Sequence, residues 1–134
     1  DNERVFRTML EHLGRKEFDA CERCLAPDLY ADWPYQPAPG TPIELHGARA
    51  LMEYIAAGTA DFDPYSYQVD QVYRLADPDT LIAEYGSFTR YRPTGREYAN
   101  RYLGIFRFRD GLITYWREYV NPEIIRRAMQ QDAE

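Results

Sequence analysis

The spacing of apolar residues divides the chain into a helical first half and a strand-rich second half. Over residues 2–13, apolar side chains recur every three or four positions, which predicts an amphipathic helix capped by Asn2 and ended at Gly14. The same spacing over residues 18–25 predicts a second, shorter helix, which Pro27 stops.

A stiff loop is predicted in the middle of the first half. Residues 29–33 are typical of a short strand, and residues 34–42 follow with four prolines and a glycine. Proline fixes φ and lacks a backbone donor, so this segment can be neither a helix nor a central strand. Apolar positions from Ala48 to Ile55 then predict a third helix that ends near Gly58.

The second half alternates apolar and polar residues and is rich in aromatic side chains, which is typical of strands. We expect four strands separated by short turns, at residues 65–75, 80–91, 97–109 and 112–120. The Asp110-Gly111 pair between the last two strands is a strong hairpin signal. Asn121 and Pro122 then open a short C-terminal helix as its cap and first residue.

Helices gathered early and antiparallel strands gathered late indicate an α+β fold. Long antiparallel strands twist and curl, so helices on the concave face would enclose a tapering cavity. We therefore expect a cone-shaped, curved antiparallel or mixed sheet packed with three N-terminal helices and a short C-terminal helix. With 134 residues, the chain should form one domain over its whole length, residues 1–134.

Composition and charge narrow the partners. The chain is 45% apolar, as expected of a folded protein. Its net charge is −6 and its sequence has no block of like charges, so nucleic acid is not an expected partner. No apolar run approaches the ~20 residues of a membrane span, so no membrane partner is expected either. Two cysteines suit a reducing cytoplasm. Cys21 and Cys24 have the spacing of a metal or redox pair, but zinc needs two more ligands, so we predict two core thiols, no metal site and no cofactor.

Glu118 is the first candidate for catalysis. Alternation along the last strand puts Leu112, Thr114, Trp116, Glu118 and Val120 on one face. A carboxyl group facing an apolar interior has a raised pKa and can exchange protons at neutral pH. The alternative is a structural ion pair with a nearby arginine.

Two further carboxylates are candidate catalytic residues. Glu84 lies on a strand face with apolar neighbours, so it could enter the same cavity and couple with Glu118; an ion pair with Arg101 is the alternative. Asp32 ends the first strand beside the proline-rich loop, as a pocket acid or as a residue that caps the loop.

Polar and aromatic side chains could complete a substrate pocket. Asn100 and Tyr102 share a strand face and could orient a carbonyl group, or they could simply belong to a mixed strand face. The candidate substrate-binding aromatic residues, which could equally be core residues, are Trp33, Tyr35, Tyr54 and Trp116. Tyr35 belongs to the proline-rich loop, which we expect to act as the gate of the pocket. The predicted ligand is a small hydrophobic or aromatic compound.

The order of elements resembles that of the nuclear transport factor 2-like superfamily, which includes ketosteroid isomerase and the SnoaL-like polyketide cyclases. The stretch from residue 74 to 122 resembles the phenazine-biosynthesis A/B proteins. The motifs that carry this likeness are Leu75-Ala76-Asp77-Pro78, Ala83-Glu84-Tyr85-Gly86, Glu97-Tyr98-Ala99-Asn100, Asp110-Gly111-Leu112-Ile113 and Arg117-Glu118-Tyr119-Val120-Asn121-Pro122. The resemblance implies a cone-shaped fold, a homodimer formed through the open sheet face, and an acidic site residue at Glu118.

The sequence departs from these families at several site positions. The phenazine family's pocket histidine aligns with Tyr54, and the general-base position of ketosteroid isomerase falls on Trp33, one residue after Asp32. The arginine and aspartate required by limonene-epoxide hydrolases align with Glu84 and Gly86. We therefore expect a cofactor-independent isomerase, cyclase or condensation enzyme, with a non-catalytic ligand-binding protein or a dimerisation module as the alternatives.

Overall fold

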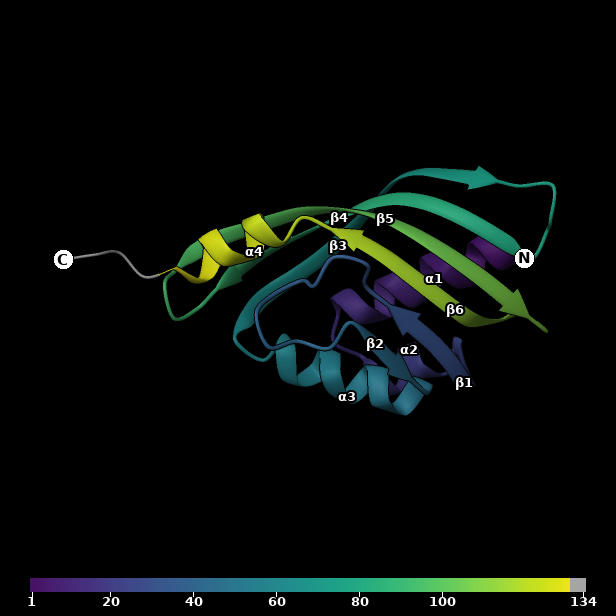
Figure 1. The fold of residues 1–134 in the computed structure, drawn as a ribbon, viewed down its shortest axis with the longest axis horizontal. Helices are drawn as coiled ribbons and strands as arrows, with labels where there is room; N and C mark the ends of the chain where they lie inside the picture. Colours follow the sequence, from purple (N-terminus) through teal and green to yellow (C-terminus); the bar gives the residue numbers. More distant parts are fainter. Residues whose placement is uncertain (131–134) are drawn as a thin grey trace.

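The computed structural model describes residues 1–130 and is built on one curved, six-stranded sheet (Figure 1). Along the chain, the elements are α1 (Asn2–Gly14), α2 (Phe18–Glu22), β1 (Leu25–Asp32), β2 (Glu44–His46), α3 (Ala48–Gly58), β3 (Phe62–Arg74), β4 (Thr80–Tyr91), β5 (Arg96–Arg109), β6 (Leu112–Val120) and α4 (Pro122–Met129). The strand order is β2-β1-β6-β5-β4-β3.

The sheet confirms the predicted α+β class, and it contains both parallel and antiparallel strand pairs. Strands β3 to β6 form an antiparallel meander, β1 joins β6 in parallel, and β2 pairs with β1 antiparallel. The β5–β6 hairpin turns at Asp110 and Gly111, whose φ values of 53° and 78° lie in the left-handed region. Two positive φ values in a two-residue turn match the twist of the flanking strands, as the Asp-Gly signal predicts. None of the described helices is long and apolar enough to cross a membrane.

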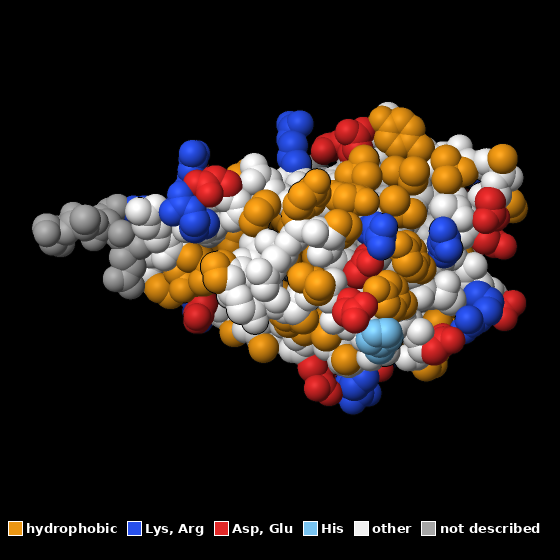
Figure 2. All heavy atoms as spheres, in the orientation of Figure 1, with side chains coloured by type: hydrophobic (Ala, Val, Ile, Leu, Met, Phe, Trp, Pro, Cys, Tyr) orange, Lys and Arg blue, Asp and Glu red, His pale blue; other side chains and the backbone are white. Residues whose placement is uncertain are grey.

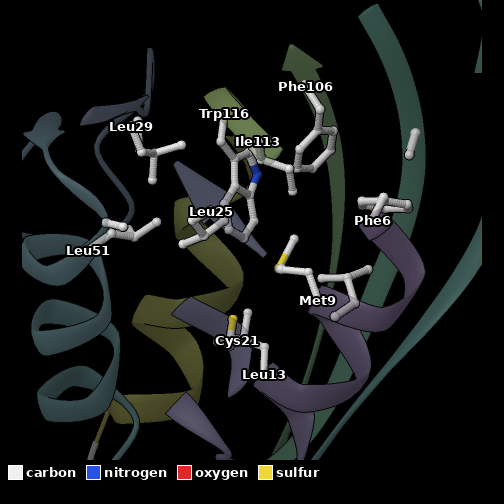
Figure 3. Close-up of a cluster of buried hydrophobic side chains, with 14 of the residues drawn as sticks. Phe6, Met9, Leu13, Cys21, Leu25, Leu29, Leu51, Phe106, Ile113 and Trp116 are labelled. Carbon is white, nitrogen blue, oxygen red and sulfur yellow. The ribbon is translucent and has the colours of Figure 1, made fainter. Parts of the chain in front are cut away.

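Helices α1, α2 and α3 lie along one side of the curved sheet, and α4 lies beside the far end of β5 (Figure 1). The core fills the end where α1 meets the sheet. There, Phe6 of α1 packs against Phe106 of β5 with ring centroids 4.7 Å apart. Figure 3 shows Met9, Ile113 and Trp116 pointing into the same cluster. Burial of these side chains anchors the helices to one end of the sheet and leaves the other end to be lined by α3, α4 and the loop before β2.

Several predicted boundaries are wrong for local reasons. The second helix ends at Glu22, and β1 begins at Leu25, so Pro27 lies within the strand, in the stretch where pairing with β6 shifts register. Asp1, not Asn2, caps α1, because its carboxylate accepts from the Glu3 amide while the Asn2 side chain donates to Pro78. The three-residue β2 is too short to show an alternating pattern and was not predicted.

The alternation predicted for the last strand holds only for its second half. Arg107 pairs with Tyr115 and Phe108 with Ile113, so Thr114 is an extra residue in β6. This bulge reverses the faces. Ile113 is fully buried, whereas Leu112 and Thr114 are not, and the cavity-facing series begins at Trp116.

Candidate active site

A cavity of about 330 Å³ occupies the end of the molecule that the core leaves open. Its walls come from α1, β1, β3, β5, β6, α3 and α4, together with the proline-rich loop. The lining is mostly apolar and aromatic. Pockets of this size and character are typical of small-molecule sites.

Glu118 lies on the cavity wall and is held by two neutral donors. Trp33 donates its indole N–H to Oε1 over 3.3 Å, and the Tyr85 hydroxyl donates to Oε2. Tyr85 in turn accepts a hydrogen bond of 3.1 Å from the Trp116 indole. These bonds come from strands β4 and β6 and from the end of β1, so the orientation of the carboxyl group is set by the sheet itself.

The pKa of Glu118 is raised to about 7, because burial penalises the carboxylate. The hydrogen bonds from Tyr85 and Trp33 favour the ionised form and limit the rise. A carboxyl group with this pKa is present in both forms near neutral pH. It can therefore accept a proton from a bound compound and return it.

A glycine makes room for this arrangement. Gly104 of β5 is the cross-strand partner of Glu118. A Cβ atom at this position would lie 2.6 Å from Cε2 of Phe106 and 3.0 Å from Cε1 of Tyr85. Any larger residue must therefore displace the rings of Phe106 and Tyr85, and Tyr85 is a donor to Glu118. Neither Gly104 nor Tyr85 was identified from the sequence, although glycine inside a strand often signals such a close approach.

Tyrosines form much of the cavity wall. Tyr65, Tyr67, Tyr98 and Tyr102 line the cavity, and the Tyr102 hydroxyl lies 2.6 Å from the Ser87 hydroxyl. Burial raises the pKa of all four phenols, and the negative charge of Glu118 adds to the effect. They therefore stay protonated and can donate hydrogen bonds to a ligand. Only Tyr102 of these was predicted.

The structure places four of the predicted residues together with Glu118. Trp33, Tyr54, Tyr102 and Trp116 all line the cavity, and the Trp33 and Tyr54 rings pack with centroids 5.5 Å apart.

Asp32 faces away from the cavity, so the expectation of a pocket acid there is wrong. It is buried on the other face of β1, where Arg117 holds it with two hydrogen bonds of 2.9 and 2.7 Å. Asp32 and Arg117 are registered partners on β1 and β6. The following residue, Trp33, points into the cavity, because successive strand residues alternate faces.

Glu84 and Asn100 also lie outside the cavity lining. Glu84 is exposed on the outer face of β4 and accepts a 2.6 Å hydrogen bond from Tyr73, so the expectation that it meets Glu118 is wrong. Asn100 is buried, but its amide nitrogen donates to the Tyr98 hydroxyl and to the Asn121 carbonyl. These bonds tie β5 to the start of α4 instead of orienting a ligand.

Tyr35 does not contribute to the pocket either. Its side chain is 63% exposed and packs near the Tyr119 ring, with centroids 6.2 Å apart. The proline-rich loop does reach the cavity, but through Pro37, Pro39 and Thr41 among others. The predicted position of the loop beside the cavity is therefore correct, but the predicted position of the Tyr35 ring in the cavity is wrong.

The cysteine pair has no role in this site. Cys21 is buried in the core, where burial raises the pKa of its thiol to about 12. Across residues 1–130, the structure gathers no group of three or more His, Cys, Asp or Glu side chains suited to a metal ion.

Comparison with protein families identifies the fold group. The profile of the SnoaL-like domain matches residues 6–116, which is most of the chain. The chain belongs to the SnoaL-like family. The matched range includes Trp33, Tyr54, Tyr85 and Trp116, and it ends two residues before Glu118.

Individual proteins are similar to this SnoaL-like chain in sequence or in fold. It is 33% identical to the uncharacterised protein YesE of Bacillus subtilis over 124 residues, covering 92% of this chain and 84% of YesE. A crystal structure of a proposed isomerase from Bacillus subtilis superposes with a TM-score of 0.84 at 27% identity, over 93% of this chain and 89% of the other. A phenazine biosynthesis-related protein from Pseudomonas aeruginosa has a TM-score of 0.77 at 19% identity, over 99% and 87%.

Proposed function

We propose that this SnoaL-like protein is a cofactor-independent acid/base enzyme, acting as an isomerase, cyclase or condensation catalyst on a hydrophobic carbonyl or aromatic compound. The observation that carries the proposal is the position of Glu118, a carboxyl group with a pKa of about 7 on the wall of an apolar cavity. A group that titrates near neutral pH is suited to both halves of a proton transfer.

The proposed reaction moves a proton within the bound compound. The Glu118 carboxylate takes a proton from a carbon next to a carbonyl group, so the C–H bond breaks and an O–H bond forms on Glu118. The electron pair left on carbon delocalises onto the carbonyl oxygen, towards which a cavity tyrosine such as Tyr102 donates a hydrogen bond. Protonated Glu118 then returns the proton to a different atom of the compound.

Hydrogen exchange tests this proposal without knowledge of the natural substrate. 2-Tetralone is a hydrophobic bicyclic ketone with acidic C–H groups next to its carbonyl, and its hydrogen exchange in D₂O can be followed by NMR. We expect the protein to accelerate the exchange and Glu118→Gln to reduce the acceleration by about 10²-fold or more. Glu84→Gln is the matched control, because Glu84 is a carboxylate on the outer face, and it should retain the full rate.

The second candidate function is binding without chemistry. The apolar character of the cavity favours it, as does the fact that both oxygens of Glu118 already accept hydrogen bonds. Under this alternative, 2-tetralone binds saturably while its exchange rate stays at the rate in buffer, for the natural chain and for Glu118→Gln alike.

We also propose that the protein is a homodimer in the cytoplasm. Exposed apolar side chains on neighbouring outer-face strands support the dimer: Tyr73 of β3, Phe88 of β4 and Leu103 of β5. The free thiols of Cys21 and Cys24 are compatible with a reducing compartment. Light scattering of the natural chain and of Leu103→Glu would test the dimer, because a charge at a buried apolar contact should favour the monomer.

A further inference from the structure

The charges around the cavity are unbalanced. Glu118 is the only acidic side chain among the described residues that line the cavity, and that lining contains no lysine, arginine or histidine. The chain has 16 lysine and arginine residues in total, so the deficit is local and does not reflect composition. Glu118 is held only by neutral donors, Tyr85 and Trp33.

Several carboxylates elsewhere in the molecule have cationic partners. Figure 2 shows acidic and basic side chains next to one another on the surface of the face in view. Contacts of 3.0 Å or less join carboxylates to guanidinium groups in the pairs Glu3–Arg7, Asp28–Arg109 and Asp32–Arg117. A carboxylate removed from bulk water is costly unless it is paired. The cavity therefore lacks the positive charge that would balance Glu118.

Aromatic rings surround the place where such a charge would bind. Trp33 donates a hydrogen bond to Glu118, and the Tyr54 ring packs against the Trp33 ring. The faces of tryptophan and tyrosine rings attract cations, more strongly when water is excluded. The cavity lining includes eight aromatic side chains: Trp33, Tyr54, Phe62, Tyr65, Tyr67, Tyr98, Tyr102 and Trp116.

We infer that the cavity selects flat organic cations, that is, aromatic compounds with a quaternary or protonated nitrogen placed against Glu118. This inference deepens the proposed function by naming the charge of the compound. It rests on the proposed function only in assuming that the bound cation is also the compound on which Glu118 acts. The ring faces and the single carboxylate would attract a cation together. An anion would meet the carboxylate with no positive side chain in the lining to offset the repulsion.

Three bicyclic probes of nearly the same shape separate charge from hydrophobicity. They are N-methylquinolinium as the cation, 1-methylnaphthalene as the neutral compound and 1-naphthoate as the anion. Affinities for the natural chain are measured at pH 8 by fluorescence and calorimetry. We expect the cation to bind about tenfold or more tightly than the neutral compound, and the anion to bind more weakly than either.

The variant that tests the origin of this preference is Glu118→Gln. It should bring the affinity for N-methylquinolinium down to about that for 1-methylnaphthalene measured on the same variant, so that the preference for the cation is lost. Asp32→Asn is the matched control, because it removes a carboxylate from the opposite face of the sheet and should preserve the preference. Circular dichroism and thermal melting establish that each variant is folded.

The cation preference should also depend on pH. The titratable groups that face Glu118 from the neighbouring elements are tyrosines with raised pKa values: Tyr54, Tyr65, Tyr67, Tyr85, Tyr98 and Tyr102. They stay neutral between pH 5 and 8, so Glu118 alone should control the change. Affinity for the permanently charged N-methylquinolinium should fall as the pH drops through about 7, whereas affinity for 1-methylnaphthalene should not.

Equal affinities for the cation and the neutral compound in the natural chain would overturn the inference. An unchanged cation preference in Glu118→Gln would overturn it too. These outcomes are independent of the exchange experiment with 2-tetralone. A chain that prefers the cation but does not accelerate exchange retains the charge selectivity and loses the proposed chemistry, and the reverse result retains the chemistry and loses the selectivity.

Discussion

Two carboxylates on opposite faces of the same pair of strands have opposite environments. Asp32 of β1 faces outwards and binds Arg117 of β6 through both oxygens, and the Arg117 guanidinium also lies 5.9 Å from the centre of the Tyr115 ring. Glu118, the next residue along β6, faces the cavity and accepts only from Tyr85 and Trp33. Asp32 is registered with Arg117, and Glu118 is one residue further along β6. Because successive strand residues point to opposite faces, this one-residue difference places a paired structural carboxylate on one face and an unpaired carboxylate in the cavity.

The largest expected effect concerns the pH dependence of stability. Because the pKa of Glu118 is about 7 in the folded chain and near 4.5 when exposed, the folded state binds the extra proton between these values. The free energy of unfolding should therefore fall as pH rises from about 4.5 to 7, by at most about 3 kcal/mol. Glu118→Gln should remove this decline.

Chemical denaturation at a series of pH values measures the effect. The informative quantity is the difference between the natural chain and Glu118→Gln, because carboxylates with lowered pKa values, such as Glu3 and Asp77, affect both chains equally at lower pH. If the difference in unfolding free energy between the two chains stays constant from pH 4.5 to 8, Glu118 does not have a raised pKa in the folded state.

Removal of the outer carboxylate should have the opposite signature. Asp32→Asn removes a carboxylate whose side chain is only 10% exposed and leaves Arg117, which is 37% exposed, without its charged partner. We expect a loss of about 1–3 kcal/mol in the free energy of unfolding and an unchanged rate of 2-tetralone exchange. A large loss of exchange activity with intact stability would break the division between structural and chemical carboxylates.

The sequence predicted the fold through local signals. Asp110-Gly111 predicts a turn and Asn121-Pro122 predicts a helix start, and each signal depends only on two neighbouring residues. Both predictions are confirmed. The site depends instead on which face each strand residue occupies, and here the pattern is ambiguous. In β4, both faces contain apolar residues, because Ile82 and Phe88 flank Glu84 on the outer face.

This ambiguity explains which site residues were missed. A two-sided apolar strand gives no way to decide between Glu84 and its neighbour Tyr85 as the inward residue. Glu118 was predicted from alternation over the whole strand and from the family resemblance, and the prediction that it faces the cavity holds because the alternation fails only at Leu112 and Thr114, before Trp116. The gap that Gly104 leaves for Tyr85 depends on atoms from two strands, so it could only be recognised in three dimensions.

A smaller effect is expected from the hydrogen bond that holds Glu118. Tyr85→Phe keeps the buried ring and removes the hydroxyl that donates to Oε2. Because this bond favours the carboxylate, its loss should raise the pKa of Glu118 by about one unit. The alkaline shift should be seen in the pH profile of exchange and in the ¹³C chemical shift of the Glu118 carboxyl carbon.

Phe106→Leu is a suitable comparison for Tyr85→Phe, because it disturbs packing beside the same ring without removing a donor to Glu118. It should lower stability and leave the pKa of Glu118 unchanged. If Phe106→Leu and Tyr85→Phe shift the pH profile equally, packing and not the hydroxyl group sets the pKa.

The smallest effect is expected at Tyr35, where the prediction from the sequence and the structure disagree. A gate residue would lose ligand affinity when truncated, but Tyr35 is 63% exposed and contacts the outer ring of Tyr119 instead of lining the cavity. We therefore expect Tyr35→Ala to change affinity for N-methylquinolinium less than twofold and stability by no more than about 0.5 kcal/mol. Thr41→Val, in the same loop but on the cavity wall, is the positive comparison and should change ligand affinity more than Tyr35→Ala does. A larger loss of affinity in Tyr35→Ala than in Thr41→Val would mean that the loop closes over the ligand with Tyr35 turned inwards.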